Sequence, residues 1–182
     1  MTCPTEVLWS RPTLSRFVCY KLLTLIPVSA ALIAITRYAE SLVWAGVYVT
    51  LCLVHATVMN AIKCPHCAYY KMGDKTFSCH IWWNTPRLYK PRSSPESRLV
   101  GWYTPIGMAV LTGFPMFWLW HEWELLFIYL LSIAVFVLSI GNNECPRCLN
   151  FQCSHNTVSD RLRREYLQTI SRSGDSVMQH RA

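Results

Sequence analysis

The chain has 182 residues, of which 52% are hydrophobic and only 15% are charged, and its formal net charge is +7. Four long stretches are almost free of charge, which argues against a soluble domain with polar residues every few positions. Nucleic-acid binding is also disfavoured. The basic residues are concentrated in the segments that flank these stretches, where anionic lipid headgroups are a sufficient partner for their charge.

Residues 1–16 are polar and lead into the first apolar stretch, residues 18–36. A basic start before an apolar run resembles a signal peptide, and Ser29-Ala30-Ala31 resembles a cleavage site. The apolar run continues well beyond this point, however, and is longer than the core of a usual signal peptide. We therefore expect a first helix that is retained in the protein.

Three further apolar stretches follow, at residues 42–62, 100–120 and 124–141. A helix needs ~20 apolar residues to cross ~30 Å of hydrocarbon, so the sequence predicts four transmembrane helices. Very short connections join the first helix to the second and the third to the fourth, which is typical of helical hairpins. Pro105 and Pro115 predict that the third helix is kinked.

The middle of the first stretch combines a proline with small residues. Pro27 removes one backbone donor and predicts a kink in this helix as well. Ala30, Ala31 and Ala34 form a patch of small side chains. Such patches allow helix backbones to approach closely in membranes, so we expect this face to pack against another helix.

The distribution of basic residues predicts the orientation in the membrane. Of the 17 Lys and Arg residues, 16 lie in the N-terminal segment, the long central loop or the tail. The two short connections contain only one, Arg37. Four crossings place the three basic regions on the same side, which the positive-inside rule identifies as the cytoplasm. The sequence thus predicts an integral protein of the plasma or inner membrane with both termini cytoplasmic.

A cysteine pattern occurs twice, each time after an apolar stretch. The first cysteine motif, residues 64–85, contains Cys64-Pro65-His66-Cys67 and Phe77-Ser78-Cys79. The second cysteine motif, residues 145–157, contains Cys145-Pro146-Arg147-Cys148 and Phe151-Gln152-Cys153. Both end in an Asn-Thr pair. Each motif follows one predicted hairpin, and an even number of crossings separates the two copies. The two units would then have the same orientation in the membrane, which predicts parallel repeats about an axis normal to the membrane.

The predicted fold is therefore an all-α integral membrane protein, a four-helix bundle of two hairpins with cysteine-rich knuckles on the cytoplasmic side. The first unit, residues 1–99, comprises a hairpin, its knuckle and a Pro-rich linker. The second unit, residues 100–168, comprises a hairpin, its knuckle and an amphipathic segment. Residues 169–182 are predicted to be a disordered tail.

The spacing of the cysteines indicates metal binding. The cytoplasm is reducing, so disulfides are not expected there. Cys-x-x-Cys places two thiolates on one turn and a third cysteine follows, while zinc prefers four ligands in a tetrahedron. Each motif can hold its own ion with a histidine as fourth ligand, or both Cys-x-x-Cys pairs can share one ion. The candidate ligands are Cys64, Cys67, Cys79, His80, Cys145, Cys148, Cys153 and His155, with His66 as an alternative to His80.

Two other uses of the thiols remain open. An iron–sulfur cluster also uses cysteine thiolates, although the tight ferredoxin spacing is absent. Thiol redox chemistry is the second. Cys-Pro-His-Cys is similar to the active-site tetrapeptide of some thioredoxin-fold oxidants, but no βαβ pattern surrounds it. Four-helix membrane oxidoreductases that work with quinone are a better analogy, yet their cysteines lie on the oxidising side.

One further group lies inside the second stretch. Cys52, His55 and Met59 are spaced so that they share one face of a helix. All three side chains bind soft metals, so this face is a candidate intramembrane ligand site for a copper-type ion or a haem. The structural alternative is a helix contact in which His55 is hydrogen-bonded to a neighbouring helix.

Together these features predict a small membrane subunit or scaffold. A cytoplasmic thiolate site, with structural zinc as the leading cofactor, would form a basic surface that docks a protein partner or a larger membrane complex. A redox protein that exchanges electrons with quinone is the alternative, and a soft-metal carrier is the third. No nucleotide-binding glycine loop or catalytic triad order is present, and the sequence leaves open whether the protein is an enzyme.

Overall fold

The computed structural model describes residues 8, 12–72, 75–92, 97–151, 153 and 155–173. The described part is mostly helical, as the sequence predicts. Helix α7 continues to Ser173, so the first residues of the predicted tail are helical. The remainder of that tail, from residue 174 onward, lies outside the described residues.

Two long helices, α1 (Leu14–Tyr38) and α2 (Val43–Ile62), precede the first cysteine motif. The motif contains a 3-10 turn (Cys64–His66), the short helix α3 (Ala68–Met72) and two antiparallel strands, β1 (Thr76–Phe77) and β2 (Thr85–Pro86). In this small sheet Phe77 lies opposite Thr85.

Helices α4 (Arg98–Gly113), α5 (Met116–Leu119) and α6 (Trp123–Ser139) form the second half. A π-helical turn (Ile140–Glu144) and a 3-10 turn (Cys145–Arg147) extend α6 into the second cysteine motif. Helix α7 (Asp160–Ser173) is the last described element.

Three helices of the described part are long and apolar enough to cross a bilayer, namely residues 14–38, 43–66 and 123–147, counting the turns that extend α2 and α6. They match the first, second and fourth predicted stretches. Many of their large apolar side chains are exposed, for example Leu25, Leu53 and Leu138. The chain therefore has the character of a multi-pass membrane protein.

The third predicted stretch differs from the expectation, because it is divided rather than kinked. Helix α4 ends at Gly113 and α5 begins at Met116. Pro115 has no backbone N–H and its ring excludes a helical carbonyl of the preceding turn, which explains the break. With 16 residues, α4 alone is shorter than a full span. The fold by itself does not establish a fourth crossing or the hairpin repeat.

An apolar core holds the helices together in the half of the bundle that contains α5. The predicted small-residue patch is its centre, since Ala30 is 4% exposed and Ala31 and Ala34 are completely buried. Trp118 and Leu119 of α5 belong to the same core, together with Tyr48 of α2 and Tyr129 of α6. The small side chains of α1 thus admit the larger side chains of three other helices, as expected for such a patch.

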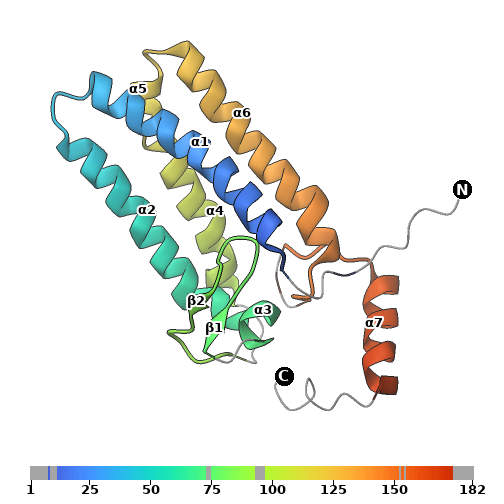
Figure 1. Ribbon diagram of the computed structural model, residues 1–182. Helices are drawn as coiled ribbons and strands as arrows, with labels where there is room; N and C mark the ends of the chain where they lie inside the picture. Colours follow the sequence, from blue (N-terminus) through green and yellow to red (C-terminus); the bar gives the residue numbers. More distant parts are fainter. Residues whose placement is uncertain are drawn as a thin grey trace, which may run out of the picture.

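The two helices of the first predicted hairpin contact each other, but the most extensive packing lies between the hairpins. The most extensive packing joins α1 to α6, while α2 packs against α4. As Figure 1 shows, the start of α1, the end of α2, the start of α4 and the end of α6 all lie at one end of the bundle, together with α3, β1 and β2. Both cysteine motifs therefore lie at this end, called the cysteine end below. The opposite end carries the α1–α2 turn and α5.

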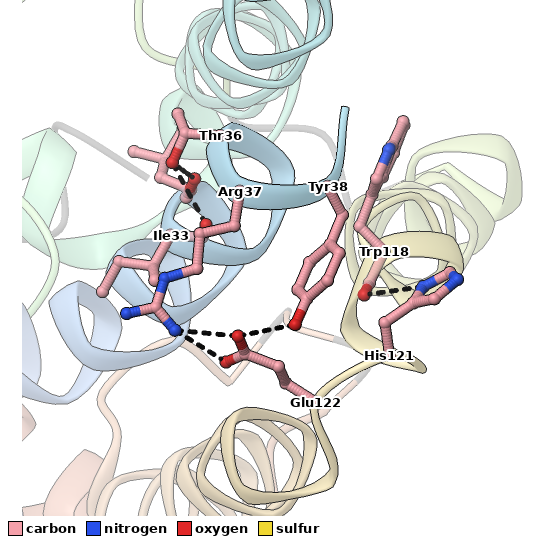
Figure 2. Close-up of polar contacts among 8 residues, drawn as sticks. Ile33, Thr36, Arg37, Tyr38, Trp118, His121 and Glu122 are labelled. Atoms are coloured by element: carbon pink, nitrogen blue, oxygen red, sulfur yellow. Dashed lines mark hydrogen bonds and ion pairs between the residues drawn. The ribbon is translucent and has the colours of Figure 1, made fainter. Parts of the chain in front are cut away.

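A polar contact links α1 to the start of α6 at the opposite end (Figure 2). Arg37 Nη1 donates to both carboxylate oxygens of Glu122, at 2.8 and 3.1 Å, and the Tyr38 hydroxyl donates to Oε1 at 2.8 Å. Tyr38 also stacks on His121, with ring centroids 5.3 Å apart. These groups fix the end of one long helix to the beginning of another.

Candidate functional site

Both cysteine motifs begin with the same local structure. In each, Cys-Pro-x forms a 3-10 turn with proline near its start. At this position a backbone N–H would have no hydrogen-bond partner within the turn, so its absence in proline costs nothing. In the first motif the Cys67 N–H donates to the Cys64 carbonyl at 2.9 Å, which closes the turn. The two cysteines of each pair are therefore presented on one tight turn, as their spacing predicts.

Backbone N–H groups point at three of the sulfur atoms. Cys79 Sγ accepts from the N–H groups of Ile81 and Trp82, at 3.4 and 3.3 Å. Cys148 Sγ accepts from Asn150 N–H at 3.4 Å, and Cys67 has the equivalent bond from Tyr69, also two residues later. Donors of this kind stabilise a negatively charged sulfur, so these turns are suited to hold thiolates.

The thiols lie close enough to interact electrostatically, both within and between the motifs. In the first motif Cys67 interacts with Cys64 and Cys79, and in the second Cys148 interacts with its motif partners Cys145 and Cys153. The two groups are connected, because Cys67 also interacts with Cys148. The fold thus brings six cysteines from distant parts of the chain to the same end of the bundle (Figure 1).

A tyrosine of the first motif makes a direct contact with the second. The Tyr69 hydroxyl on α3 is hydrogen-bonded by the backbone N–H of Leu149 and interacts with the neighbouring Cys148. Tyr69 is 9% exposed and Leu149 is 5% exposed. The contact between the motifs is therefore a packed one, and it holds the loops of the two halves against each other.

Burial keeps these thiols neutral in the absence of a cation. Burial, with a smaller contribution from neighbouring cysteines, raises the pKa of Cys148 to about 11 and raises the pKa of Cys67 well above its ordinary value. Burial also raises the pKa of Cys79, against the effect of its two N–H donors. A bound cation would reverse this balance, because it stabilises the thiolate form of every cysteine that contacts it.

A buried carboxylate borders the thiols. Glu144 lies at the end of the π-helical turn before Cys145 and is 9% exposed. Its Oε1 accepts a hydrogen bond from the Tyr20 hydroxyl of α1 at 3.2 Å, and its Oε2 lies 3.9 Å from His80 Nδ1. Burial lowers the pKa of His80, while Glu144 opposes this shift. The imidazole is then neutral at pH 7, which is the form that binds metal ions.

Aromatic residues of the central loop cover this end of α1. Lys21 lies over the Trp82 ring, with Nζ 5.4 Å from the centroid, and Phe17 packs against Trp83 at 5.9 Å. The loop is therefore held against the first turns of α1, and Lys21 lies near Cys79 as well.

The structure does not bring all predicted ligands together equally. All described cysteines are free thiols, and the described residues contain no group of three or more His, Cys, Asp or Glu side chains already placed to hold a metal ion. His155 is exposed, whereas His80 and His66 are largely covered. Metal binding would therefore require the thiols to close around the ion.

The predicted intramembrane face is the packing surface between α2 and α4. His55 stacks on Tyr103, with ring centroids 5.6 Å apart, and lies directly against Gly107, where an added Cβ would be 2.7 Å from Nδ1. Met59 Sδ accepts a hydrogen bond from Thr104 at 3.9 Å. Cys52 packs against the apolar core instead. This face therefore takes part in helix packing, but the expected hydrogen bond is not seen at His55 Nδ1, which is buried without a hydrogen-bond partner among the described residues.

Two residues of this region have no role in the sequence prediction. Glu144 had an available signal, because it is the only acidic residue between residues 125 and 159 and directly precedes Cys145. Tyr20 had none, because its partner lies 124 positions away in the chain.

The class of protein shown by fold and composition is a helical membrane protein with a cluster of thiols at one end. Comparison with protein-family models, curated proteins and solved structures gives no match.

Proposed function

We propose that the chain is a four-span membrane subunit whose two cysteine motifs form one shared metal–thiolate site on the cytoplasmic side. Zinc is the leading metal. The ion would join the two halves of the chain and stabilise a basic cytoplasmic surface, and a protein partner would dock there. The observation that carries the proposal is the packed contact between the two motifs, in which Tyr69, two residues after Cys67, is buried together with Leu149, the residue after Cys148.

The donor set agrees with such a site. Zinc takes four ligands, and the two motifs supply six thiols with N–H donors already directed at three of them. The pairs Cys64–Cys67 and Cys145–Cys148 are the leading ligands, and Cys79, Cys153 and His80 lie near enough in the chain to replace one of them. When bound, zinc supplies no redox chemistry but fixes its ligands in a tetrahedron and adds folding free energy.

Four crossings are supported by the lipid-facing surface of α4. Leu99, Trp102, Ile106 and Val110 lie on one face of the helix and are 53–83% exposed. Its 16 residues span ~24 Å at 1.5 Å per residue, and α5 continues toward the far end of the bundle (Figure 1). If the broken third segment crosses the membrane, both motifs share one side of it, and the distribution of basic residues supports the cytoplasm as that side.

The test is metal analysis of the full-length protein purified anaerobically in mild detergent. A shared site predicts a colourless protein with about one zinc per chain, which Cys67→Ser and Cys148→Ser each abolish. Cys19→Ser is the matched control, because Cys19 is an exposed cysteine on α1, and it should retain the metal. Two zinc ions per chain, each lost separately, would show two independent sites. A protein without metal would refute the proposal.

The orientation has its own check. A thiol reagent that cannot cross membranes should leave Cys64 and Cys145 unlabelled when added to intact cells and should label them only after the membrane is opened. Labelling from outside would place the cysteines in the oxidising compartment and would contradict the cytoplasmic site.

A redox protein is the second candidate, and the number of thiols favours it. Six cysteines at one end exceed the four that a single zinc ion needs. An iron–sulfur cluster or a dithiol pair would use them to exchange electrons with quinone in the membrane. The same purified protein distinguishes the two candidates, because an iron–sulfur cluster gives visible absorbance that decreases on reduction, whereas zinc gives none.

A further inference from the structure

The central loop exposes apolar and basic side chains next to each other in residues 87–92. Leu88 is 70% exposed and Tyr89 is 39% exposed, and Lys90 and Arg92 are exposed as well. Over its whole length, residues 63–99, the loop contains seven basic and two acidic residues. Apolar side chains and cations in one exposed segment are typical of surfaces that bind at the membrane interface.

The backbone of this segment is fixed against the first cysteine motif. The Arg92 N–H donates to the Pro65 carbonyl at 2.9 Å. Tyr89 N–H donates to the Tyr70 hydroxyl at 3.0 Å, and that hydroxyl donates to the Tyr89 carbonyl at 2.9 Å. On the side of the segment, all of these bonds use the main chain. The segment therefore keeps its position without its exposed side chains, which remain on the surface.

Contacts between α2 and α4 show how deep the ends of these two helices lie. Met59 Sδ accepts from the Thr104 hydroxyl at 3.9 Å, and Lys63 Nζ donates to the same hydroxyl at 2.8 Å. Because the two helices run in opposite directions, Lys63 at the end of α2 and Arg98 at the start of α4 lie at about the same depth. Each is the first cation beyond an apolar stretch, so the hydrocarbon of the bilayer ends near both.

Residues 87–92 lie just beyond this boundary. Pro65, whose carbonyl holds the Arg92 N–H, is only two residues past Lys63. The headgroup layer adds ~5–7 Å on each side of the hydrocarbon, so the segment lies at headgroup level. The exposed face of α4 begins at this same depth, with Leu99 83% and Trp102 67% exposed. The segment thus continues the lipid-facing surface into the layer that contains the phosphates.

We infer that residues 87–92 form a binding surface for an anionic phospholipid, with Lys90 and Arg92 attracting its headgroup and Leu88 contacting its acyl chains. This inference rests on the crossings in the proposed function but not on the metal. Cations at a membrane surface each favour an anionic lipid by about fivefold. A lipid bound there would hold the first cysteine motif at the bilayer surface.

The experiment measures lipid binding to the full-length protein in detergent by native mass spectrometry. Phosphatidylglycerol and phosphatidylcholine with the same acyl chains are compared, and the wild type should prefer phosphatidylglycerol by about twentyfold. Lys90→Gln and Arg92→Gln should each reduce this preference about fivefold. Leu88→Ser should weaken both lipids equally, because they share the same chains. Arg164→Gln removes the same charge from an exposed position of α7 and should leave the preference unchanged.

The outcomes separate the lipid surface from the metal site. Absence of a lipid preference in the wild type would overturn the inference, and binding of polyglutamate in that case would assign the surface to an acidic protein partner. An equal loss in Arg164→Gln and Lys90→Gln would also overturn it, because total charge would then explain the attraction. Zinc content is measured on the same samples. A metal-free protein that keeps the preference refutes only the metal site, and a zinc-loaded protein without it refutes only the lipid surface.

Discussion

The two ends of the bundle are held together by different kinds of contact. The end opposite the cysteines is built on apolar side chains, with Ala31, Ala34 and Leu119 completely buried, and its charged groups are exposed apart from the partly buried Glu122. At the cysteine end lie three of the four polar residues that are buried in the described part of the chain, Asn60, His66 and Glu144. The six thiols of the two motifs and most of the buried polar residues therefore lie at one end, which is the end where we propose the metal site.

The comparison also explains why the two ends need different support. Apolar packing has no strict directional requirement, so the alanine patch tolerates the broken helix α4–α5 beside it. Buried polar groups must each find a partner, which is costly if the partner moves. The cysteine end accordingly contains the small sheet, the 3-10 turns and many side-chain-to-backbone hydrogen bonds. Four predictions test this division, from the largest expected effect to the smallest.

Removal of Tyr70 should disrupt the cysteine end. Tyr70 is completely buried, its ring packs against Phe77 with centroids 4.6 Å apart, and its hydroxyl donates to the Tyr89 carbonyl at 2.9 Å. Tyr70→Ala should destabilise the protein by about 3–5 kcal/mol, measured as a lower midpoint of thermal unfolding in detergent. Phe117→Ala removes an exposed ring at the opposite end and is the control. Equal effects of both changes would contradict the comparison.

Overfilling the alanine patch should weaken the opposite end. Ala34 is completely buried against other helices, so Ala34→Leu forces them apart and should cost about 1–3 kcal/mol. Ala109→Leu adds the same side chain at an exposed position of α4 and should leave the midpoint unchanged. Metal content should be preserved in both variants, because the change is remote from the thiols. Loss of metal from Ala34→Leu would mean that the two ends do not act independently.

The two Asn-Thr pairs look equivalent in the sequence but should respond differently to the same change. Asn156 Nδ2 donates to the carbonyls of Cys148 and Asn150, at 2.9 and 3.0 Å, and its Oδ1 accepts from Val158. Asn84 instead occupies a left-handed turn, with φ of 47°.

Asn156→Gly should therefore lose these bonds and destabilise the second motif by about 1–2 kcal/mol. Asn84→Gly should be neutral or slightly stabilising, because glycine adopts that backbone conformation without strain. Faster alkylation of Cys148 in Asn156→Gly, but not in Asn84→Gly, is the expected local signature. Similar behaviour of the two variants would show that the pairs have the same role.

The sequence predicts the long helices well and the assembly of the site only in part. The first, second and fourth stretches were predicted within a few residues of α1, α2 and α6, because lipid-facing helices are recognised without knowledge of their partners. The break at Pro115 was expected only as a kink. Whether a proline bends or divides a helix depends on the side chains packed around it, here Trp44 and Tyr48 against Phe114.

The same limit applies to the site. Regular spacing identifies Cys64, Cys67, Cys145 and Cys148 as chemically related, but it cannot state that the two motifs lie against each other through a contact of Tyr69 with Leu149. That contact depends on α1 packing against α6 and on α2 packing against α4. The arrangement of helices also creates the Tyr20–Glu144 bond, so residues that lack a local pattern enter the site only through the fold.

The smallest expected effect concerns the ion pair at the opposite end. The hydrogen bond from Arg37 and the one from Tyr38 lower the pKa of Glu122 below its ordinary value of 4.5. A lowered pKa in the folded state means that the ion pair stabilises the protein above pH 4.5, and that this contribution disappears as the pH falls through the lower value. Both partners are on the surface, so salt should screen the interaction. Glu122→Gln should therefore lower the midpoint of thermal unfolding slightly at pH 7 and low salt, and the effect should vanish at high salt and fade as the pH falls through the lowered pKa. Glu124→Gln is the adjacent control.

If Glu122→Gln instead lowered the midpoint as much as Tyr70→Ala and did so at every salt concentration, the opposite end would depend on a polar contact as strongly as the cysteine end does.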